Sequence, residues 1–138
     1  MDFKLELVVV PVSDVDRAKA FYADKMGFTV DVDHAPNEHF RVVQLTPPGS
    51  AASITIGTGV TKSEPGAYQG LHLVVNDIEA ARAELVGRGV DASEPFHFGP
   101  EGQTPGVDPA RGDYGSYVSV SDPDGNGWLI QEVKYQAR

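Results

Sequence analysis

The stretch VPVSDVDRAKAFYADKMGF, residues 10–28, decides the fold because it joins an extended segment to a helix. Residues 5–12 are rich in β-branched side chains, a composition typical of a strand. Ser13 and Asp14 follow where the N-cap of a helix belongs, since their side-chain oxygens can accept from the first backbone N–H groups. Apolar residues then recur at helical spacing, and Gly27 is a natural helix stop. The stretch therefore predicts a strand followed by a helix.

Three shorter strands are predicted after this helix. They cover residues 28–33, 40–46 and 53–56, and the last two are joined across a Pro-Pro-Gly turn at 47–49. Residues 57–70 are rich in Gly, Thr, Ser and Pro and predict a linker. The first half of the chain is therefore predicted as one strand, one helix and three strands.

The same pattern restarts in GLHLVVNDIEAARAEL, residues 70–85. Its β-branched start predicts a strand, and Asn76 and Asp77 predict a second helix cap. Glu79 stands three residues after Asn76, the spacing of a capping box. A final hairpin is predicted across an Asp-Pro-Asp-Gly turn, so the second half repeats the order of the first.

Two spacings measure this internal repeat. Asp14 and Asp77 hold the same place before the two helices and are 63 residues apart. Gly49 and Gly125 hold the same place in two hairpin turns and are 76 residues apart. The second copy therefore carries 13 extra residues between its helix and its last hairpin.

The extra residues fall in HFGPEGQTPGVDPARGDYG, residues 97–115, which has no hydrophobic periodicity and predicts a long loop. A loop of this length is a lid, a binding loop or a mobile surface insertion. Phe98, Arg111 and Tyr114 favour a lid, because they offer ring surface and a charge to a neighbouring site.

Composition excludes several classes of protein. The chain has 138 residues, enough for one domain with a real core. It carries 11 Lys and Arg against 20 Asp and Glu, so a nucleic-acid partner and an anionic membrane are not expected. Without cysteine it has no disulfide, no thiolate nucleophile and no Cys-ligated zinc. No apolar run approaches the ~20 residues of a membrane helix, and the acidic start is unlike a secretory signal. We therefore expect a cytoplasmic protein.

Residues 10–28 and 70–85, together with SDPDGNGWLIQE at 121–132, resemble the signatures of the vicinal oxygen chelate superfamily. That superfamily includes glyoxalase I, bleomycin-resistance proteins and extradiol ring-cleavage dioxygenases. The resemblance covers about residues 4–133. It implies an α+β fold in which two tandem βαβββ modules form a curved mixed sheet around a cup.

The resemblance also implies a domain organisation. We expect a single domain over residues 1–138, with module 1 at about 4–57, a linker at 58–69 and module 2 at about 70–133. Family members commonly pair, and the open edges of two half-sheets invite pairing, so a homodimer is expected.

Metal-using members of the superfamily hold a divalent cation with His and Glu from the first and last strand of each module. The matching positions here are Leu7 and Ser53 in the first module and Gly70 and Leu129 in the second. Leu and Gly have no donor atom in the side chain, and Ser is a poor ligand for such metals. We therefore expect no cofactor, with a divalent metal in a non-standard site as the alternative.

The positions one step further along each strand share the same face and should also line the cup. They are Val9, Thr55, His72 and Gln131. His72 is the candidate catalytic base, because imidazole transfers protons near neutral pH. A structural histidine bonded to a neighbouring backbone group remains the alternative. The expected ligand-binding residues are His72, Gln131, Thr55, Ser53, Leu7, Val9, Leu129, His97 and Tyr114.

An apolar cup with few polar groups is typical of a small-molecule site. The leading hypothesis is a metal-independent protein that binds an apolar or aromatic small molecule. A second hypothesis is a lyase, isomerase or dioxygenase that uses a divalent metal or His72. A third is a non-catalytic structural dimer.

Overall fold

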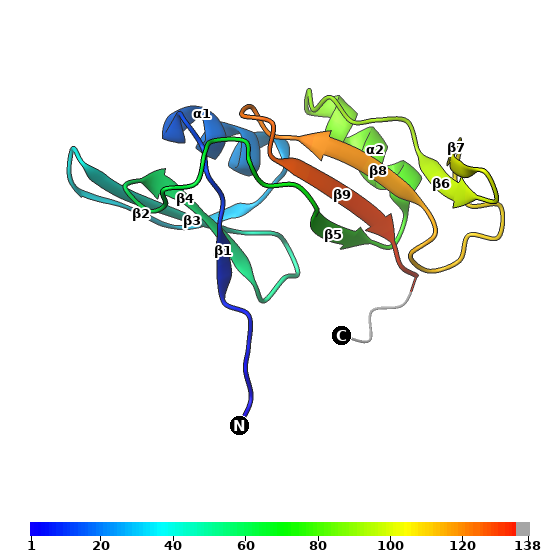
Figure 1. The fold of residues 1–138 in the computed structure, drawn as a ribbon, viewed down its shortest axis with the longest axis horizontal. Helices are drawn as coiled ribbons and strands as arrows, with labels where there is room; N and C mark the ends of the chain where they lie inside the picture. The colour runs from blue at the N-terminus through cyan, green and yellow to red at the C-terminus, as the bar shows by residue number, and fades with distance from the viewer. Residues whose placement is uncertain (135–138) are drawn as a thin grey trace. The chain divides into compact units, whose positions relative to one another are not determined.

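The computed structural model describes residues 1–134 and divides the chain into two compact units (Figure 1). Unit 1 comprises residues 1–68 together with 122–126, and unit 2 comprises 69–121 and the chain from 127 onward. Each unit has its own mixed sheet, and the order of elements repeats along the chain. The expected α+β class and the tandem βαβββ arrangement are therefore confirmed.

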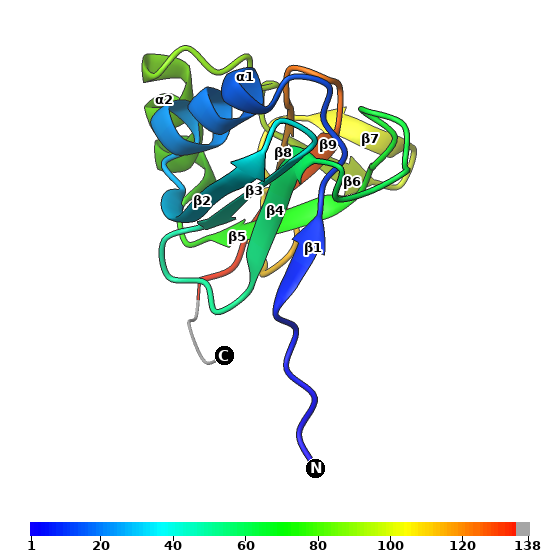
Figure 2. The same cartoon turned by 90° about the vertical axis from the view of Figure 1, so that its left-hand side faces the viewer.

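Unit 1 holds a four-stranded sheet in the order β1-β4-β3-β2. The β1 strand runs parallel to β4, and the other neighbours are antiparallel. Figure 2 shows the helix of this unit along one side of its sheet. The elements are β1 (Leu7–Val9), α1 (Val15–Ala20), the π-helical segment η1 (Phe21–Lys25), β2 (Thr29–Asn37), β3 (Phe40–Thr46) and β4 (Ser53–Thr58).

The helix begins where the sequence predicts. Asp14 is the N-cap, and its side chain accepts a hydrogen bond from Arg17 N at 3.0 Å. The helix widens into η1 and ends before Gly27, whose φ of 81° favours glycine. The α1 helix packs on β4, where Ile54 and Ile56 are buried. The core of unit 1 therefore lies between α1 and one face of its sheet.

Unit 2 holds a five-stranded sheet in the order β5-β9-β8-β6-β7, with β5 parallel to β9. Its elements are β5 (Leu71–Val75), α2 (Ile78–Gly87), β6 (Phe96–Gly99), β7 (Gly102–Pro105), β8 (Tyr117–Ser121) and β9 (Gly127–Glu132).

The lack of periodicity in residues 97–115 predicted a loop throughout. Only part of this segment is a loop. Its first part pairs as the hairpin β6–β7, with His97 opposite Thr104. Gly102 has a φ of 103° and makes the tight turn possible. The prediction was wrong here because the strands are short and their pairing partner lies within the segment itself.

The helix α2 begins at the predicted Asn76–Asp77 cap, but its capping box differs from the prediction. Asp77, not Asn76, is the N-cap, and its side chain accepts from Ala80 N at 3.1 Å. With Asp77 as the N-cap, Ala80 and not Glu79 stands at the third helical position, so the expected capping box does not form in this described helix. Glu132 of β9 accepts from Ile78 N at 2.9 Å, so a carboxylate from a distant strand satisfies one of the free N–H groups at this helix start.

The Asp-Pro-Asp-Gly-Asn turn between β8 and β9 belongs to unit 1. Tyr22 donates its hydroxyl proton to Asp122 at 2.7 Å, and both side chains are buried. The buried Asn126 amide donates to Pro11 O and to Asp122, each at 2.8 Å. This turn is thus a structural part of unit 1 as well as a hairpin connection.

Candidate functional site

Alternation along the strands of unit 2 places two rows of side chains on opposite faces of its sheet. Buried Trp128, Ile130 and Glu132 of β9 face α2, which packs on β8 and β9. The other face, here called the open face of unit 2, carries His72, Val74, Tyr117, Ser119, Leu129 and Gln131.

His72 and Gln131 meet on this open face. The Nδ1 atom of His72 lies 3.1 Å from Oε1 of Gln131. Since an amide oxygen only accepts, the imidazole carries its proton on Nδ1, and Nε2 is left as an acceptor in the neutral ring. The Gln131 amide NH₂ remains as a donor. The pair therefore offers one donor and one acceptor side by side.

The register of this pair differs from the one that the repeat predicts. His72 lies opposite Leu129, and Val74 lies opposite Gln131, so the His72–Gln131 contact is diagonal. The repeat predicts Gly70 opposite Leu129 instead. The connection from strand to helix cap is shorter in unit 2 than in unit 1, which shifts the strand against its partner.

Three aromatic rings gather beside β8 and β6 on unit 2. Phe96 stacks on Tyr117 with ring centroids 5.6 Å apart, and Phe98 meets Tyr117 edge-on at 5.3 Å. Phe98 is 60% exposed and Val74 is 46% exposed, so apolar surface stands in water on this side. We call Phe96, Phe98 and Tyr117 the aromatic cluster.

Sequence reasoning did not assign the aromatic cluster to the site. The alternation Phe96-His97-Phe98 was a usable signal, because it places two rings on one face of a strand. Tyr117 joins them only through the pairing of β6 with β8, where it lies opposite Phe96.

Two further expected site residues lie elsewhere in unit 2. His97 alternates with the cluster, and its Nδ1 donates to Gly106 O at 2.8 Å. Tyr114 is half-buried with a φ of 62°, and its backbone N–H donates to Glu132 O at 2.8 Å. Neither contact points to a ligand, so both residues hold the segment between β7 and β8 in place.

The equivalent positions of unit 1 lie on the sheet face away from α1. Leu7 lies opposite Ser53, and Val9 lies opposite Thr55. Ser53 and Thr46 hydroxyls are 2.7 Å apart, and Thr46 in turn donates to the carboxylate of Asp31.

The Thr55 side chain is 5% exposed. Its hydroxyl has no hydrogen-bond partner in the described part of the chain. The equivalent positions of unit 1 therefore carry buried hydroxyl groups and no aromatic ring.

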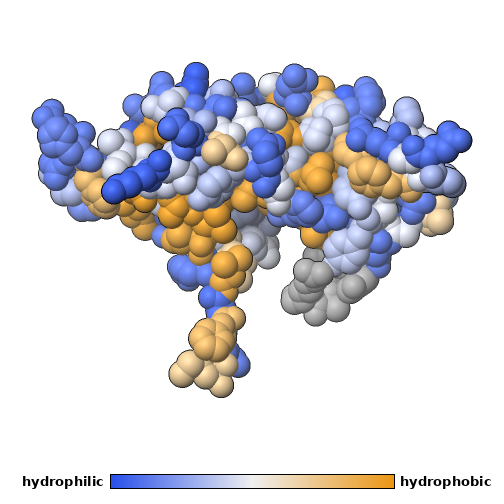
Figure 3. Space-filling model, in the orientation of Figure 1, coloured by the Kyte–Doolittle hydropathy of each residue, from blue (hydrophilic) through white to orange (hydrophobic). Residues whose placement is uncertain are grey.

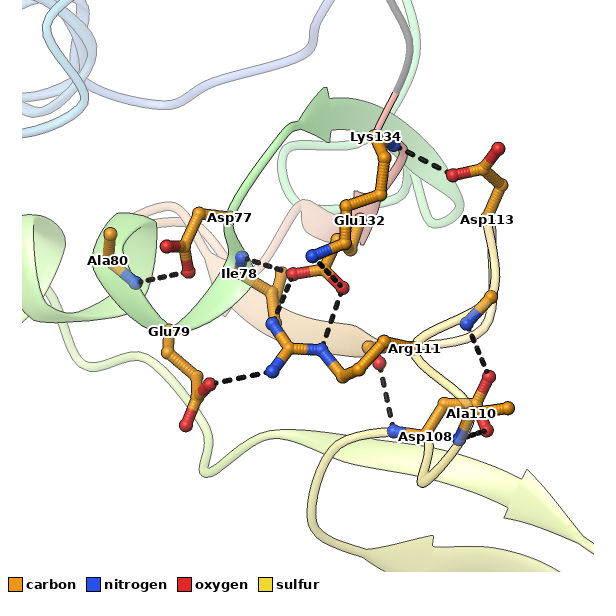
Figure 4. A network of polar contacts seen from close by, with 12 residues as sticks. Asp77, Ile78, Glu79, Ala80, Asp108, Ala110, Arg111, Asp113, Glu132 and Lys134 are labelled. Atoms are coloured by element: carbon orange, nitrogen blue, oxygen red, sulfur yellow. Dashed lines mark hydrogen bonds and ion pairs between the residues drawn. The ribbon is translucent and has the colours of Figure 1, made fainter.

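An ion pair between half-buried Arg111 and buried Glu132 anchors the segment between β7 and β8 (Figure 4). Arg111 donates to both carboxylate oxygens of Glu132, at 3.0 and 2.6 Å, and also to Glu79 at 3.0 Å. Glu132 has no exposed surface. The guanidinium and the Ile78 N–H lower the pKa of Glu132 to about 2, and the two carboxylates raise the pKa of Arg111 above its usual value.

The same segment is held by its own side chains. Asp108 accepts from the backbone of Ala110 and Gly112 at 3.1 and 2.9 Å, and its own N–H donates to Ser116 Oγ at 2.9 Å. Asp113 accepts from Lys134 N at 2.7 Å. Residues 106–116 therefore form an ordered strap rather than a floppy insertion.

The residues at the expected metal-binding positions do not match the metal ligands of the superfamily. Leu7 and Ser53 are neighbours in unit 1, and Leu129 has His72 beside it in unit 2. His72 alone supplies a nitrogen, without a carboxylate at these positions. Across residues 1–134, no group of three or more His, Cys, Asp or Glu side chains could hold a metal ion. The side chains at these positions therefore do not fit a divalent metal ion.

A family model described as the Glyoxalase/Bleomycin resistance protein/Dioxygenase superfamily matches residues 4–130. The chain therefore belongs to this superfamily. None of the helices described, over residues 1–134, has the length and apolar character needed to span a bilayer.

Particular relatives add detail. The chain is 26% identical over 129 residues to the uncharacterized protein YetH of Bacillus subtilis (strain 168), covering 91% of this chain and 94% of that one. It resembles the crystal structure of TnmS3, an antibiotic binding protein from Streptomyces sp. CB03234, with a TM-score of 0.74 and 32% identity over 95% and 96% of the two chains. A superfamily member from Sphaerobacter thermophilus DSM 20745 matches with a TM-score of 0.73 and 27% identity, over 96% and 98%.

Proposed function

We propose that this protein binds a small planar aromatic molecule on the open face of unit 2 and holds it without using a metal. The observation that carries the proposal is the aromatic cluster beside the His72–Gln131 pair. Exposed rings offer stacking surface, and a few directed polar groups set orientation, as in most small-molecule sites. The similarity to an antibiotic binding protein supports sequestration as the role.

The polar pair defines the ligand further. The Gln131 NH₂ requires an acceptor on the ligand, and His72 Nε2 requires a donor. An aromatic ring that carries a neighbouring donor and acceptor, such as an aryl carboxamide, satisfies both. We propose that the ligand belongs to this class. We also propose that the protein is a homodimer and is located in the cytoplasm.

A titration with naphthalene-2-carboxamide tests the proposal. Its isostere 2-acetylnaphthalene replaces the NH₂ with a methyl group and so removes the donor. We expect the wild type to bind the carboxamide more tightly than 2-acetylnaphthalene. The His72→Phe variant should bind both compounds equally, because the phenyl ring has no nitrogen that accepts from the ligand NH₂.

The aromatic cluster has its own test with the same probe. Phe98→Ala should weaken carboxamide binding about tenfold, since a ring contact and its buried surface are lost. Phe40→Ala is the matched control, because Phe40 is an exposed phenylalanine in unit 1. Equal binding by both variants in isothermal calorimetry would contradict the proposal.

Proton abstraction by His72 is a second candidate function. The observation that favours it is the bare Nε2, fixed by the Nδ1 contact to Gln131. Exchange of the methyl protons of 2-acetylnaphthalene in D₂O, followed by NMR, measures this activity. A rate above background that disappears in His72→Phe would favour the enzyme over the binding protein.

A further inference from the structure

The dipeptide Asn126-Gly127 is chemically the most labile asparagine site in this chain. The sequence has three asparagines, Asn37, Asn76 and Asn126, and glycine follows only the last of them. Because glycine has no Cβ, its backbone nitrogen can approach the amide carbon of the preceding side chain with little steric resistance. In a flexible chain, Asn126 is therefore expected to deamidate first.

The reaction needs only water as a co-reactant. The backbone nitrogen of Gly127 attacks Cγ of Asn126, an N–C bond forms, and the bond from Cγ to the side-chain nitrogen breaks. Ammonia leaves with the proton that the Gly127 nitrogen gave up. Water then opens the resulting succinimide ring and leaves aspartate or isoaspartate, so the NH₂ group is replaced by OH. Alkaline conditions speed the attack because the nitrogen must lose its proton.

The folded protein holds the Asn126 amide away from this geometry. The side chain has no exposed surface, so it contributes nothing to the surface drawn in Figure 3. Its NH₂ donates to Pro11 O and to Asp122 Oδ2, each at 2.8 Å. Its Oδ1 accepts from Tyr68 N at 3.1 Å. These three hydrogen bonds must break before the amide can turn toward the Gly127 nitrogen.

The backbone on both sides of the reacting bond is held as well. The N–H of Asn126 donates to Asp122 Oδ1 at 2.9 Å, and its carbonyl accepts from Asp122 N at 3.0 Å. Gly127 begins β9 and lies opposite Ser121 of β8. Closing the succinimide ring requires different backbone dihedrals at Asn126, so the hairpin opposes the reaction too.

We propose that Asn126-Gly127 is a deamidation site that reacts only after residues 122–126 leave unit 1, and that the product prevents their return. The chain before and after residues 122–126 belongs to unit 2, so this turn can leave unit 1 without unfolding of unit 2. Such local opening requires less free energy than global unfolding. The inference is independent of the ligand proposed for the open face.

The product cannot restore the contacts of the amide. An aspartate at position 126 has no NH₂ to donate, and its carboxylate would lie beside the Asp122 carboxylate and Pro11 O, which both accept. A second buried carboxylate without a donor is strongly unfavourable. Isoaspartate adds a methylene group to the backbone and so shifts β9 against β8. Because ammonia is lost, molecules that have opened and reacted accumulate.

Peptide mapping by mass spectrometry tests the site in the wild type. In mildly alkaline guanidinium chloride, Asn126 should deamidate before Asn37 and Asn76. In the same buffer without denaturant, Asn126 should react at least about a hundredfold more slowly, because only the opened fraction reacts. Asn37 and Asn76 are internal controls, since both are exposed in the folded chain and should change little. A native rate at Asn126 within a few-fold of the denatured rate would overturn the proposal.

Tyr22→Phe tests whether the local opening controls the reaction. The variant removes the hydroxyl that donates to Asp122 at 2.7 Å. The native deamidation rate of Asn126 should rise about tenfold, while the rate in guanidinium chloride stays the same. Glu132→Gln is the matched control, because it weakens a contact of unit 2 and should leave the native rate within about twofold of the wild type. Equal increases in both variants, or no increase in Tyr22→Phe, would overturn the local opening.

Asn126→Asp tests the effect of the product. It should unfold at a lower urea concentration than Asn126→Ala, because both variants lose the amide and only Asn126→Asp adds a charge beside Asp122. Wild type deamidated in guanidinium chloride should likewise fail to regain its native tryptophan fluorescence on dilution, a signal that comes from Trp128 alone. An equal or higher midpoint for Asn126→Asp, or full recovery of the fluorescence, would overturn the block to return.

Discussion

Gly66 shows at the scale of one residue how closely unit 1 holds the turn before β9. Its φ is 81°, and its N–H donates to Pro11 O at 3.2 Å. A Cβ on Gly66 would lie only 2.1 Å from Asp124 O. Glycine is required here by the backbone conformation and by this close approach together.

Gly66→Ala should therefore destabilise the protein by more than the cost of holding an alanine at a positive φ. Gly49 is the matched control, because its φ of 82° is nearly the same and open space surrounds a Cβ there. Gly49→Ala should cost about 1–2 kcal/mol, and Gly66→Ala about 2 kcal/mol more. Urea unfolding measures both, and equal midpoints would show that the contact with Asp124 is unimportant.

Residue-level reasoning found part of the candidate site. Strand alternation was enough to bring His72 and Gln131 together, because residues two apart share a face. It could not bring Phe98 to Tyr117, since their contact depends on which strands pair across a long stretch of sequence.

At the scale of elements, Arg111 and Glu132 join the strap at 106–116 to β9 and to the start of α2. Glu132→Gln should destabilise the protein by about 2–3 kcal/mol, because it leaves the guanidinium without its buried partner. Glu79→Gln is the matched control: it loses an exposed pair to the same arginine and should cost less than about 1 kcal/mol. Chemical unfolding of the two variants checks the difference.

The same pair predicts a pH dependence. The pKa of Glu132 falls from its ordinary 4.5 to about 2 in the folded protein. Its contribution to stability is therefore complete above pH 4.5 and is lost as the pH falls toward 2. The free energy of unfolding should decline less steeply over this window in Glu132→Gln than in the wild type. Parallel pH profiles would contradict the assignment.

At the scale of the whole molecule, the chain enters unit 1 a second time at residues 122–126. Buried Asn126 donates to Pro11 O and Asp122, and it accepts from Tyr68 N at 3.1 Å. The placement of residues 122–126 in unit 1 therefore depends on the Asn126 amide, which forms hydrogen bonds with three separate groups.

Asn126→Ala should cost about 2–4 kcal/mol, since buried polar partners are left unsatisfied. We expect the loss to appear first in unit 1, and calorimetry should then show a broadened or divided transition. Hydrogen exchange gives the location: amides of β4 should lose protection before those of β8. A uniform loss of protection would mean that the turn stabilises both units equally.

The sequence by itself determined the two-fold repeat, both helix starts and the final hairpin, because caps, turn residues and periodicity are local signals. Together with the family resemblance, it also showed that the expected metal-ligand positions Leu7, Ser53, Gly70 and Leu129 carry no His, Asp or Glu. Only the tertiary structure decided that Glu132 caps α2, that residues 97–105 pair as strands, and that three rings meet on the sheet face that carries His72 and Gln131. The contacts of Glu132 and of the rings join residues far apart in the chain, and they depend on a register that no local pattern specifies. The hairpin is local, but its strands are too short to show a period.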